Sequence, residues 1–466
     1  MEITRLCAIE VAKAIRSKTI SVKEVVSAHL ERAHEINPKI NGLTQIIDES
    51  LEQAEQMDQH HPGQDAPPLW GVPVTTKVNV DQAGFATTNG VAGFKDNIAD
   101  QDSAVVNNLK EGGAVIIART NTPEFSMRWC TSNKLHGVTV NPWNPLLTPG
   151  GSSGGGAAAV ACGIGTIAHG NDLGGSLRYP AYCCGVATIR PSMGRIPSYN
   201  PNAPERPPIT QTMSVQGPMA RTLADVRLGL DVMAGRSAKD PLWHCAKDSG
   251  RLRSGRIRIG YATTPFSCLE SHDAVKSSMD VAVKGFQDAG VEMIEMPFPH
   301  ADRIAQLWGE LLICETSVTM KQVVESHGSI EMNRVLNAYA DYFGESDLAG
   351  FLGKMSERLV MQRAANELFD QVDLFMMPTS LAPPFENDLD FIAPDRIPWM
   401  IKVQKPLHLV NLLALPSAAM PTGLADGVPT GVQLIGPMHD DHFLLDVAEK
   451  LEREIGTITH KRPFNP

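Results

Sequence analysis

The chain has 466 residues, of which 42% are hydrophobic and 20% are charged, and its formal net charge is −11. This length allows one large α/β unit or about three domains, and it buries enough surface that disulfides are not needed for stability. The negative balance, with no run of Lys and Arg, argues against nucleic acid or an anionic membrane surface as a partner.

Helices and strands alternate along the chain. The helix over 21–36 is marked by a capping box of Ser21 and Glu24, and Asn37-Pro38 is expected to end it. The other predicted helical segments cover 102–112, 155–168, 273–289, 302–370 and 442–455. The predicted strands cover 72–80, 114–118, 256–262, 291–297, 372–378 and 431–437. Loops are expected over 56–68 and 190–217, and a helix followed by an apolar strand is typical of an α/β fold.

The sequence contains no targeting or membrane-spanning signal. The N-terminal segment 1–18 carries acidic side chains and no long apolar core. The most apolar long run, 154–168, is short and consists mostly of small residues. The eight cysteines are scattered, without CxxC pairs or zinc spacing. We therefore expect a cytoplasmic protein without a metal.

Two glycine-rich segments each carry a serine. Ser152 lies in TPGGSSGGG (148–156), and Ser176 follows the glycines of GNDLGGSLR (170–178). Hydrolysis of an amide needs a nucleophile, a base and donors for the developing oxyanion. Glycines let successive backbone N–H groups point into one concavity, which suits an anion. The second segment could therefore supply the nucleophile and the donors, and its alternative interpretation is a tight glycine turn.

The base is less evident. Histidine is the usual general base, but His169, seven residues before Ser176, could equally be structural. Lys77 is the only charged residue in 71–80 and interrupts an apolar, β-like run. Burial lowers the pKa of a lysine, so a buried lysine can act as a base, and burial without a role is costly. Lys77 is therefore our candidate.

Three other short patterns are weaker. Residues 151–155 fit the G-x-S-x-G motif of α/β hydrolases, but no strand precedes them. Residues 163–168 fit G-x-G-x-x-A, but this segment enters a strand instead of leaving one. The cluster His439-Asp440-Asp441-His442 favours a polar turn and a helix cap over a metal site.

Lys77 in GVPVTTKVN, Ser152 in PGGSSGG and Ser176 in DLGGSLRYPAYCCGV together resemble the amidase signature family. The spacing is similar too, with 99 residues from Lys77 to Ser176 and 24 from Ser152 to Ser176. The resemblance implies one α/β/α domain over 1–466, with a large mixed twisted sheet and helices on both faces. Its helices of about 1–60 would pack on the core, and 148–197 would form the glycine- and serine-rich catalytic block.

The resemblance also implies a Ser–cisSer–Lys triad. Ser176 would be the nucleophile that forms an acyl-enzyme, Ser152 would relay its proton from a cis peptide after Gly151, and Lys77 would be the base. The oxyanion hole would consist of the N–H groups of Leu173, Gly174, Gly175 and Ser176.

Four further residues are predicted to support the site. Asp172 and Arg178 flank the nucleophile. We expect them to hold the glycine ribbon, which is residues 173–176, by pairing with each other or with nearby backbone. Met127 and Trp129 follow a family motif that borders the cleft. They either contact an apolar or aromatic acyl group or belong to the core.

Two positions depart from the family pattern. The family usually has Lys-Asp-Asn where this chain has Val78 between Lys77 and Asn79, and it often has Thr where this chain has Asn171. Loss of the carboxylate at 78 should favour a neutral lysine. Asn171 replaces a hydroxyl by an amide near the nucleophile.

The resemblance implies a hydrolase of carboxylic amides, and of esters or carbamates (urethanes) as further substrates. It implies small-molecule substrates, no cofactor and a homodimer as the expected assembly. The alternative is an A-type subunit of a tRNA-dependent amidotransferase, which passes ammonia to a partner. The departures at Val78 and Asn171 favour the free hydrolase. A non-catalytic binding protein is disfavoured because all three triad residues are present, and long-chain lipid amides because a membrane-binding apolar segment is lacking.

Overall fold

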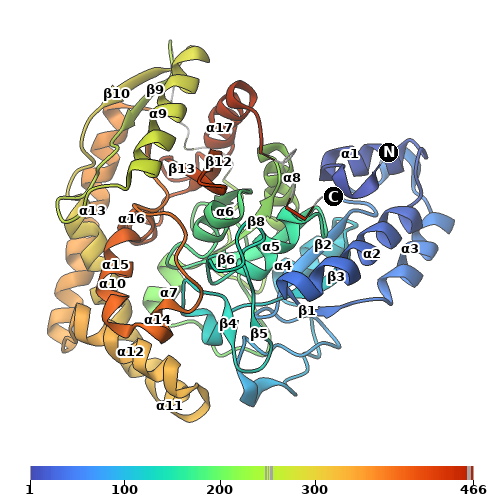
Figure 1. Ribbon diagram of the computed structural model, residues 1–466, viewed down its shortest axis with the longest axis horizontal. Helices are drawn as coiled ribbons and strands as arrows, with labels where there is room; N and C mark the ends of the chain where they lie inside the picture. The colour runs from blue at the N-terminus through green and yellow to red at the C-terminus, as the bar shows by residue number, and fades with distance from the viewer. Residues whose placement is uncertain (1, 247–248, 250, 252–254, 459–462, 465–466) are drawn as a thin grey trace.

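A computed structural model describes the chain except for residues 1, 247–248, 250, 252–254, 459–462 and 465–466. Within this part, one mixed sheet of 11 strands runs through the molecule in the order β1-β3-β2-β6-β8-β7-β12-β13-β11-β9-β10. Helices that include α5, α6, α8 and α9 pack on the sheet, whereas α10–α13 pack mainly on one another and on α16, at the far side of the molecule from α1–α3 (Figure 1). The predicted α/β class with a large mixed sheet is confirmed.

The strands of this sheet are β1 Leu43–Ile46, β2 Pro73–Lys77, β3 Val115–Thr120, β6 Ile167–Asp172, β7 Ala187–Arg190, β8 Val215–Ala220, β9 Arg258–Tyr261, β10 Glu292–Glu295, β11 Leu374–Pro378, β12 Ser417–Ala425 and β13 Val428–Ile435. A separate short pair consists of β4 Ser132–Asn133 and β5 Gly137–Val138.

The first half of the chain contributes helices α1 Ala8–Arg16, α2 Val22–Ile40, α3 Ser50–Gln59, α4 Ala104–Glu111, α5 Gly154–Ala161, α6 Arg178–Cys184, α7 Pro208–Met213 and α8 Leu223–Met233. The second half contributes α9 Asp273–Asp288, α10 Ala301–Thr319, α11 Lys321–His327, α12 Ile330–Phe343, α13 Leu348–Gln371, α14 Leu389–Ile392, α15 Ile397–Val403, α16 Lys405–Leu413 and α17 Asp441–Ile455.

Strand direction positions the site. β2 runs parallel to both of its neighbours, β3 and β6. The carboxyl ends of parallel strands meet at one edge of a sheet, so the last residues of β2 and β6 lie side by side. The helix α5 consists of small, fully buried residues and packs on this part of the sheet. Small side chains allow that close approach, as the sequence suggested.

The expected end of the second helix is wrong. α2 continues through Pro38 to Ile40 and ends at Asn41, whose backbone is left-handed. Pro38 is exposed and lies in the last turn, where water can satisfy the carbonyl that loses its N–H partner. The capping box at Ser21 and Glu24 is confirmed.

The two predicted loops are shorter than expected. α3 extends into 56–68, and 190–217 contains α7 and the start of β8. Pro208 lies in the first turn of α7, a position that tolerates proline because its missing N–H would have no helical partner. Strand β12 was not predicted at all; Pro421 interrupts its apolar run, and the register shifts between Pro421 and Gly423.

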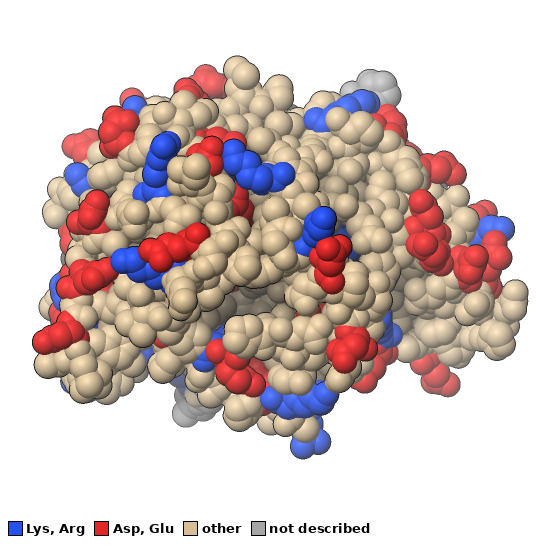
Figure 2. All heavy atoms as spheres, turned by 90° about the horizontal axis from the view of Figure 1, so that it is seen from below, with Lys and Arg blue, Asp and Glu red and all other residues tan. Residues whose placement is uncertain are grey.

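Lys and Arg do not gather on the face that Figure 2 shows; acidic and basic side chains are interspersed there. Among the described helices, none is long and apolar enough to cross a membrane. In the same part of the chain, no group of three or more His, Cys, Asp or Glu residues forms a candidate metal site.

Replacing Ser21 by alanine should destabilise the protein by about 1 kcal/mol, because the N-cap hydroxyl of α2 is lost. Ser21 Oγ accepts a hydrogen bond from the Glu24 N–H at 3.1 Å. Urea unfolding followed by circular dichroism measures the change. Ser27→Ala is the control, since Ser27 lies within the same helix and bonds only the exposed Glu31. Equal midpoints for Ser21→Ala and Ser27→Ala would contradict the prediction.

Candidate active site

The sheet brings Lys77 and Asn171 into contact although 94 residues separate them. Lys77 ends β2, and Asn171 is the next-to-last residue of the parallel neighbour β6. The Lys77 Nζ lies 2.8 Å from Asn171 Oδ1. Ser176 follows in the turn between β6 and α6. The same sheet edge therefore holds the predicted base and the predicted nucleophile.

Ser152 approaches Lys77 from the segment that leads into α5. The Lys77 Nζ lies 2.6 Å from Ser152 Oγ and 3.1 Å from Ser153 Oγ. The Gly151–Ser152 peptide bond is cis, as the family resemblance implied. A Cβ on Gly151 would lie 2.4 Å from the Arg128 carbonyl oxygen, so only glycine fits there.

The Lys77 amine is fully buried, and burial lowers its pKa well below the ordinary lysine value, since the ammonium form loses its hydration. The charge of Asp172 opposes this shift only in part. A neutral amine has two N–H donors and one lone pair. This count matches its three oxygen partners, Asn171 Oδ1, Ser153 Oγ and Ser152 Oγ. The Ser152 hydroxyl can then donate its proton to the lone pair.

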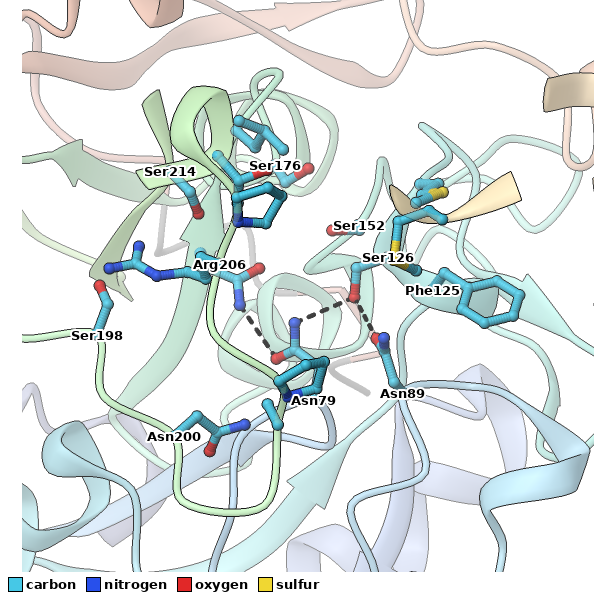
Figure 3. Close-up of a pocket in the computed structure, with 18 of the residues that line it drawn as sticks. Asn79, Asn89, Phe125, Ser126, Ser152, Ser176, Ser198, Asn200, Arg206 and Ser214 are labelled. Carbon is cyan, nitrogen blue, oxygen red and sulfur yellow. Dashed lines mark hydrogen bonds between the residues drawn. The ribbon is translucent and has the colours of Figure 1, made fainter. Parts of the chain in front are cut away.

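A chain of polar side chains continues from Asn171 along the cavity wall. Asn171 Nδ2 donates to Asn79 Oδ1 at 3.1 Å, and Asn79 Nδ2 donates to Ser126 Oγ at 3.1 Å. The Ser126 hydroxyl donates to Asn89 Oδ1 at 2.7 Å (Figure 3). The sequence predicts an amide near Ser176 at this position; in the structure the amide oxygen of Asn171 bonds Lys77.

Ser176 and Ser152 face one cavity of about 1210 Å³ (Figure 3). The Ser176 side chain is largely buried, yet its hydroxyl has no hydrogen-bond partner among the described residues. It can therefore rotate toward a ligand or toward Ser152. Apo active sites often show such unformed contacts.

The Asp172 carboxylate holds the glycine ribbon in place. It accepts hydrogen bonds from Arg178 Nε at 3.0 Å and from the Gly175 N–H at 2.9 Å. Asn411 Nδ2 donates to it as well, at 2.8 Å. Burial raises the pKa of Asp172, but Arg178, Arg190 and Asn411 outweigh that effect and hold it below its usual range. The expected pairing of Asp172 and Arg178 with each other and with backbone is present.

The backbone N–H groups of the ribbon differ in whether they are already hydrogen-bonded. The Gly175 N–H is engaged with Asp172, although the family resemblance implied it as an oxyanion donor. In the described part of the chain, no hydrogen bond uses the N–H of Leu173, Gly174 or Ser176. These three groups are available to an anion.

Two indole N–H groups donate hydrogen bonds to carbonyls of the ribbon. Trp129 Nε1 donates to the Gly174 carbonyl at 3.0 Å, and Trp308 Nε1 donates to the Leu173 carbonyl at 2.9 Å. Both rings also line the cavity, as does Met127. Met127 and Trp129 thus line the cavity, and their contact with an acyl group stays a prediction, whereas no sequence motif indicated Trp308.

Much of the cavity wall was not predicted. The sequence predicts α10 and α12 only as part of a helical stretch. In the structure these two helices supply an apolar side of the cavity, which consists of Trp308, Leu312, Ile313, Met332, Leu336, Tyr339 and Phe343. Another part of the wall is polar and includes Ser198, Asn200, Arg206 and Ser214 (Figure 3). Helical periodicity marks apolar faces but cannot tell a cavity wall from a core.

His169 lies inside the sheet. Its Nε2 lies 2.8 Å from Gln216 Oε1, and its Nδ1 accepts the Lys77 backbone N–H at 3.4 Å. Burial lowers its pKa to about 4. These contacts belong to a satisfied core histidine, which was one of the two interpretations that the sequence left open.

Comparisons with known proteins agree with this geometry. The family model Amidase matches residues 24–445. The indoleacetamide hydrolase of Bradyrhizobium diazoefficiens is 40% identical over 459 residues, covering 97% of this chain and 87% of that protein. The A-type subunit of the glutamyl-tRNA(Gln) amidotransferase of Carboxydothermus hydrogenoformans is 31% identical over 486 residues, covering 97% of this chain and 98% of that protein.

Solved structures share the fold. A bacterial aryl acylamidase of the amidase signature family superposes with a TM-score of 0.85 at 25% identity over 99% of both chains. Fatty acid amide hydrolase superposes with the same TM-score, 0.85, at 22% identity over 98% of this chain and 86% of that chain. On the family match and the similarity of nearly the whole sequence to its members, the chain belongs to the amidase signature family and is an amide-hydrolysing enzyme.

Proposed function

We propose that the enzyme hydrolyses amides of aryl-substituted acids through an acyl-enzyme on Ser176. The observation that carries the proposal is the contact of the buried Lys77 amine with Ser152, on the wall of the cavity that holds Ser176. The indoleacetamide hydrolase relative supports an aromatic acid, and the aryl acylamidase structure supports an aryl-containing amide.

Lys77 starts the reaction as a neutral amine. It accepts the proton of Ser152, which takes the proton of Ser176 in turn, and the Ser176 oxygen attacks the amide carbonyl carbon. The negative oxygen that forms there is stabilised by backbone N–H groups of the ribbon; one essential donor of this type contributes about 3–4 kcal/mol. Leu173, Gly174 and Ser176 offer those donors.

Collapse of the tetrahedral intermediate breaks the C–N bond. The proton held by Lys77 returns through Ser152 to the leaving nitrogen, and ammonia or an amine departs. A water molecule then gives its proton to the same relay and attacks the ester carbonyl of the acyl-enzyme. The carboxylic acid leaves, and Ser176 regains its proton. Esters and carbamates carry the same electrophilic carbon and are expected as further substrates.

The cavity favours an aromatic acyl group. Trp129, Trp308, Tyr339 and Phe343 line it with aromatic rings, and Leu336 adds an aliphatic wall. Flat aryl groups pack well against such surfaces, through area burial and edge or offset contacts of the rings. We place the aryl group of the substrate against this wall.

The alternative is the A-type component of a tRNA-dependent amidotransferase. The relative with that name is less similar, at 31% identity against 40% for the indoleacetamide hydrolase. An assay of the isolated chain with indoleacetamide, without partner chains or ATP, distinguishes the two functions. Hydrolysis under these conditions would favour the free hydrolase over the amidotransferase component. A homodimer remains a prediction.

Ser176→Ala and Lys77→Ala should each lower hydrolysis of indoleacetamide by about a thousandfold or more, because the nucleophile or its base is lost. Ammonia release measures the rate on a panel that adds phenylacetamide, anilides, esters and alkyl carbamates. Ser356→Ala on exposed α13 is the control and should retain the wild-type rate. Normal turnover in either active-site variant would refute the assignment.

Asn171→Asp should move the acid limb of the kcat/KM profile to higher pH. A carboxylate 2.8 Å from the Lys77 Nζ favours the ammonium form and raises the pKa of Lys77, so a higher pH is needed to free the base. Asn171→Thr, which adds no charge, should leave the limb near its wild-type position. Identical limbs in the two variants would mean that this amine is not the group that titrates.

Leu336→Trp should raise KM for phenylacetamide and indoleacetamide and leave KM for acetamide nearly unchanged. The indole ring is larger than the leucine side chain and would fill the aromatic side of the cavity. Leu336→Met conserves volume and serves as the matched control. A uniform change of KM for all three amides would place the aryl group elsewhere.

A further inference from the structure

We propose that Trp308 is a positioning residue of the oxyanion hole, because its indole N–H holds the Leu173 carbonyl so that the Gly174 N–H is aimed at the developing oxyanion. This inference rests on the proposed acyl-enzyme mechanism and adds a residue that lies 132 positions from the nucleophile in sequence. It concerns the orientation of a donor, not contact with the reacting atoms.

The geometry of one peptide unit carries the argument. The Trp308 Nε1 lies 2.9 Å from the Leu173 carbonyl oxygen. The Leu173–Gly174 peptide bond is trans, since the only cis bond in the described chain precedes Ser152. In a trans peptide the carbonyl and the following N–H point in opposite directions. Fixing the Leu173 carbonyl against Trp308 therefore fixes the direction of the Gly174 N–H, which has no partner of its own among the described residues.

Trp308 is itself held rigidly. Its ring stacks on His408 with centroids 3.9 Å apart and planes 7° apart, and Phe343 meets it edge-on at 6.2 Å. A Cβ on Gly174 would lie 2.8 Å from Trp308 Cζ2, so the glycine is what lets the ribbon lie against the indole. A rigid donor at that distance restricts the peptide plane.

His408, on which the Trp308 ring stacks, is uncharged. Both of its ring nitrogens are buried and have no hydrogen-bond partner among the described residues. Burial, with the charges of Arg178 and Lys405, lowers its pKa well below the usual histidine value, so no charge disturbs the neighbouring ribbon. Trp129 stacks on the same imidazole at 5.5 Å. The imidazole acts as a flat spacer between two indoles.

Trp129 provides an internal comparison. Its indole N–H bonds the next carbonyl, that of Gly174, at 3.0 Å, and so orients the N–H of Gly175. That N–H is already committed to Asp172. The two indoles thus act on consecutive peptides, but only the one held by Trp308 presents a donor that is unpaired within the described chain.

The hydrogen bond from Trp308 has a second effect. A carbonyl that accepts a hydrogen bond polarises its peptide, which strengthens the N–H on the other side. Loss of the indole N–H should therefore weaken the Gly174 donor as well as loosen its direction. The effect belongs mainly to the transition state, because negative charge develops on the oxygen as the tetrahedral intermediate forms and is absent from the bound amide.

Trp308→Phe removes the N–H and keeps an aromatic ring on His408; Trp129→Phe makes the same change on the neighbouring peptide. Each variant is assayed with phenylacetamide. Inhibition is measured with benzylboronic acid, whose boron bonds the Ser176 oxygen while the hydroxyl proton passes to the Ser152–Lys77 relay, giving an anionic tetrahedral adduct. Toluene, which has no oxygen to meet the backbone N–H groups, reports binding of the aryl group alone. Thermal unfolding checks that both variants fold.

For Trp308→Phe we expect kcat to fall roughly tenfold, a fraction of the roughly 10²–10³ that loss of a whole oxyanion donor costs. The inhibition constant of benzylboronic acid should rise by a similar factor, while that of toluene changes less than about twofold, because the packing of the pocket is kept. Trp129→Phe should show a clearly smaller loss of kcat.

Equal losses of kcat in the two variants, or parallel weakening of toluene and benzylboronic acid binding, would overturn the inference and leave Trp308 as a wall of the pocket. Should Trp308→Phe fail to fold, Trp308→His, which can place a ring N–H on the same side, gives the corresponding comparison: retained kcat supports the inference and a roughly tenfold loss opposes it. Failure of the mechanism itself appears separately, as hydrolysis that persists in Ser176→Ala.

Discussion

The burial of one amine constrains the whole site. Lys77 lies at the end of a central strand, its neighbour at 78 is a valine, and no acidic side chain of the described structure forms an ion pair with it. An ammonium group there would lose its hydration without a contact charge to replace it, so the neutral form is favoured. Each neighbour suits that form: an amide oxygen and a serine accept its two protons, and Ser152 faces its lone pair.

The ribbon before Ser176 is stabilised from two sides by different means. Hydrogen bonds with Asp172, which Arg178 holds in place, fix it on one side, and on the other side two indole N–H groups donate to its carbonyls. Glycine is required at both positions: Gly175 has a φ of 97° and a Cβ there would lie 2.3 Å from Leu407, and a Cβ on Gly174 would lie 2.8 Å from the Trp308 ring. In the mechanism that we propose, the backbone donors are thereby oriented before a substrate arrives, as electrostatic preorganisation requires.

Local chemistry explains which parts could be predicted. Lys77, Ser152 and Ser176 stand out because a charge in an apolar strand and serines among glycines are unusual within a few residues of sequence. β12 was missed because proline usually argues against a strand interior, and tertiary contacts overrode that tendency. α7 was missed because it lies in a segment rich in Pro, Ser and Asn, although proline suits the first turn of a helix. Trp308 gave no signal, since a tryptophan on an apolar helix face is compatible with an ordinary core. The role that we propose for it depends on a contact across 135 residues of sequence.

The network under the ribbon has a consequence for how the enzyme is made. Arg178 bonds Asn411 Oδ1 at 2.7 Å and Gln433 Oε1 at 2.8 Å, and both partners are synthesised after almost nine-tenths of the chain. Until they leave the ribosome, Arg178 and Asp172 have no complete set of partners, and the ribbon lacks its support. Domains generally fold as units during synthesis, and this one cannot finish its catalytic centre early. A nascent or truncated chain would carry the family's sequence signature and still be inactive.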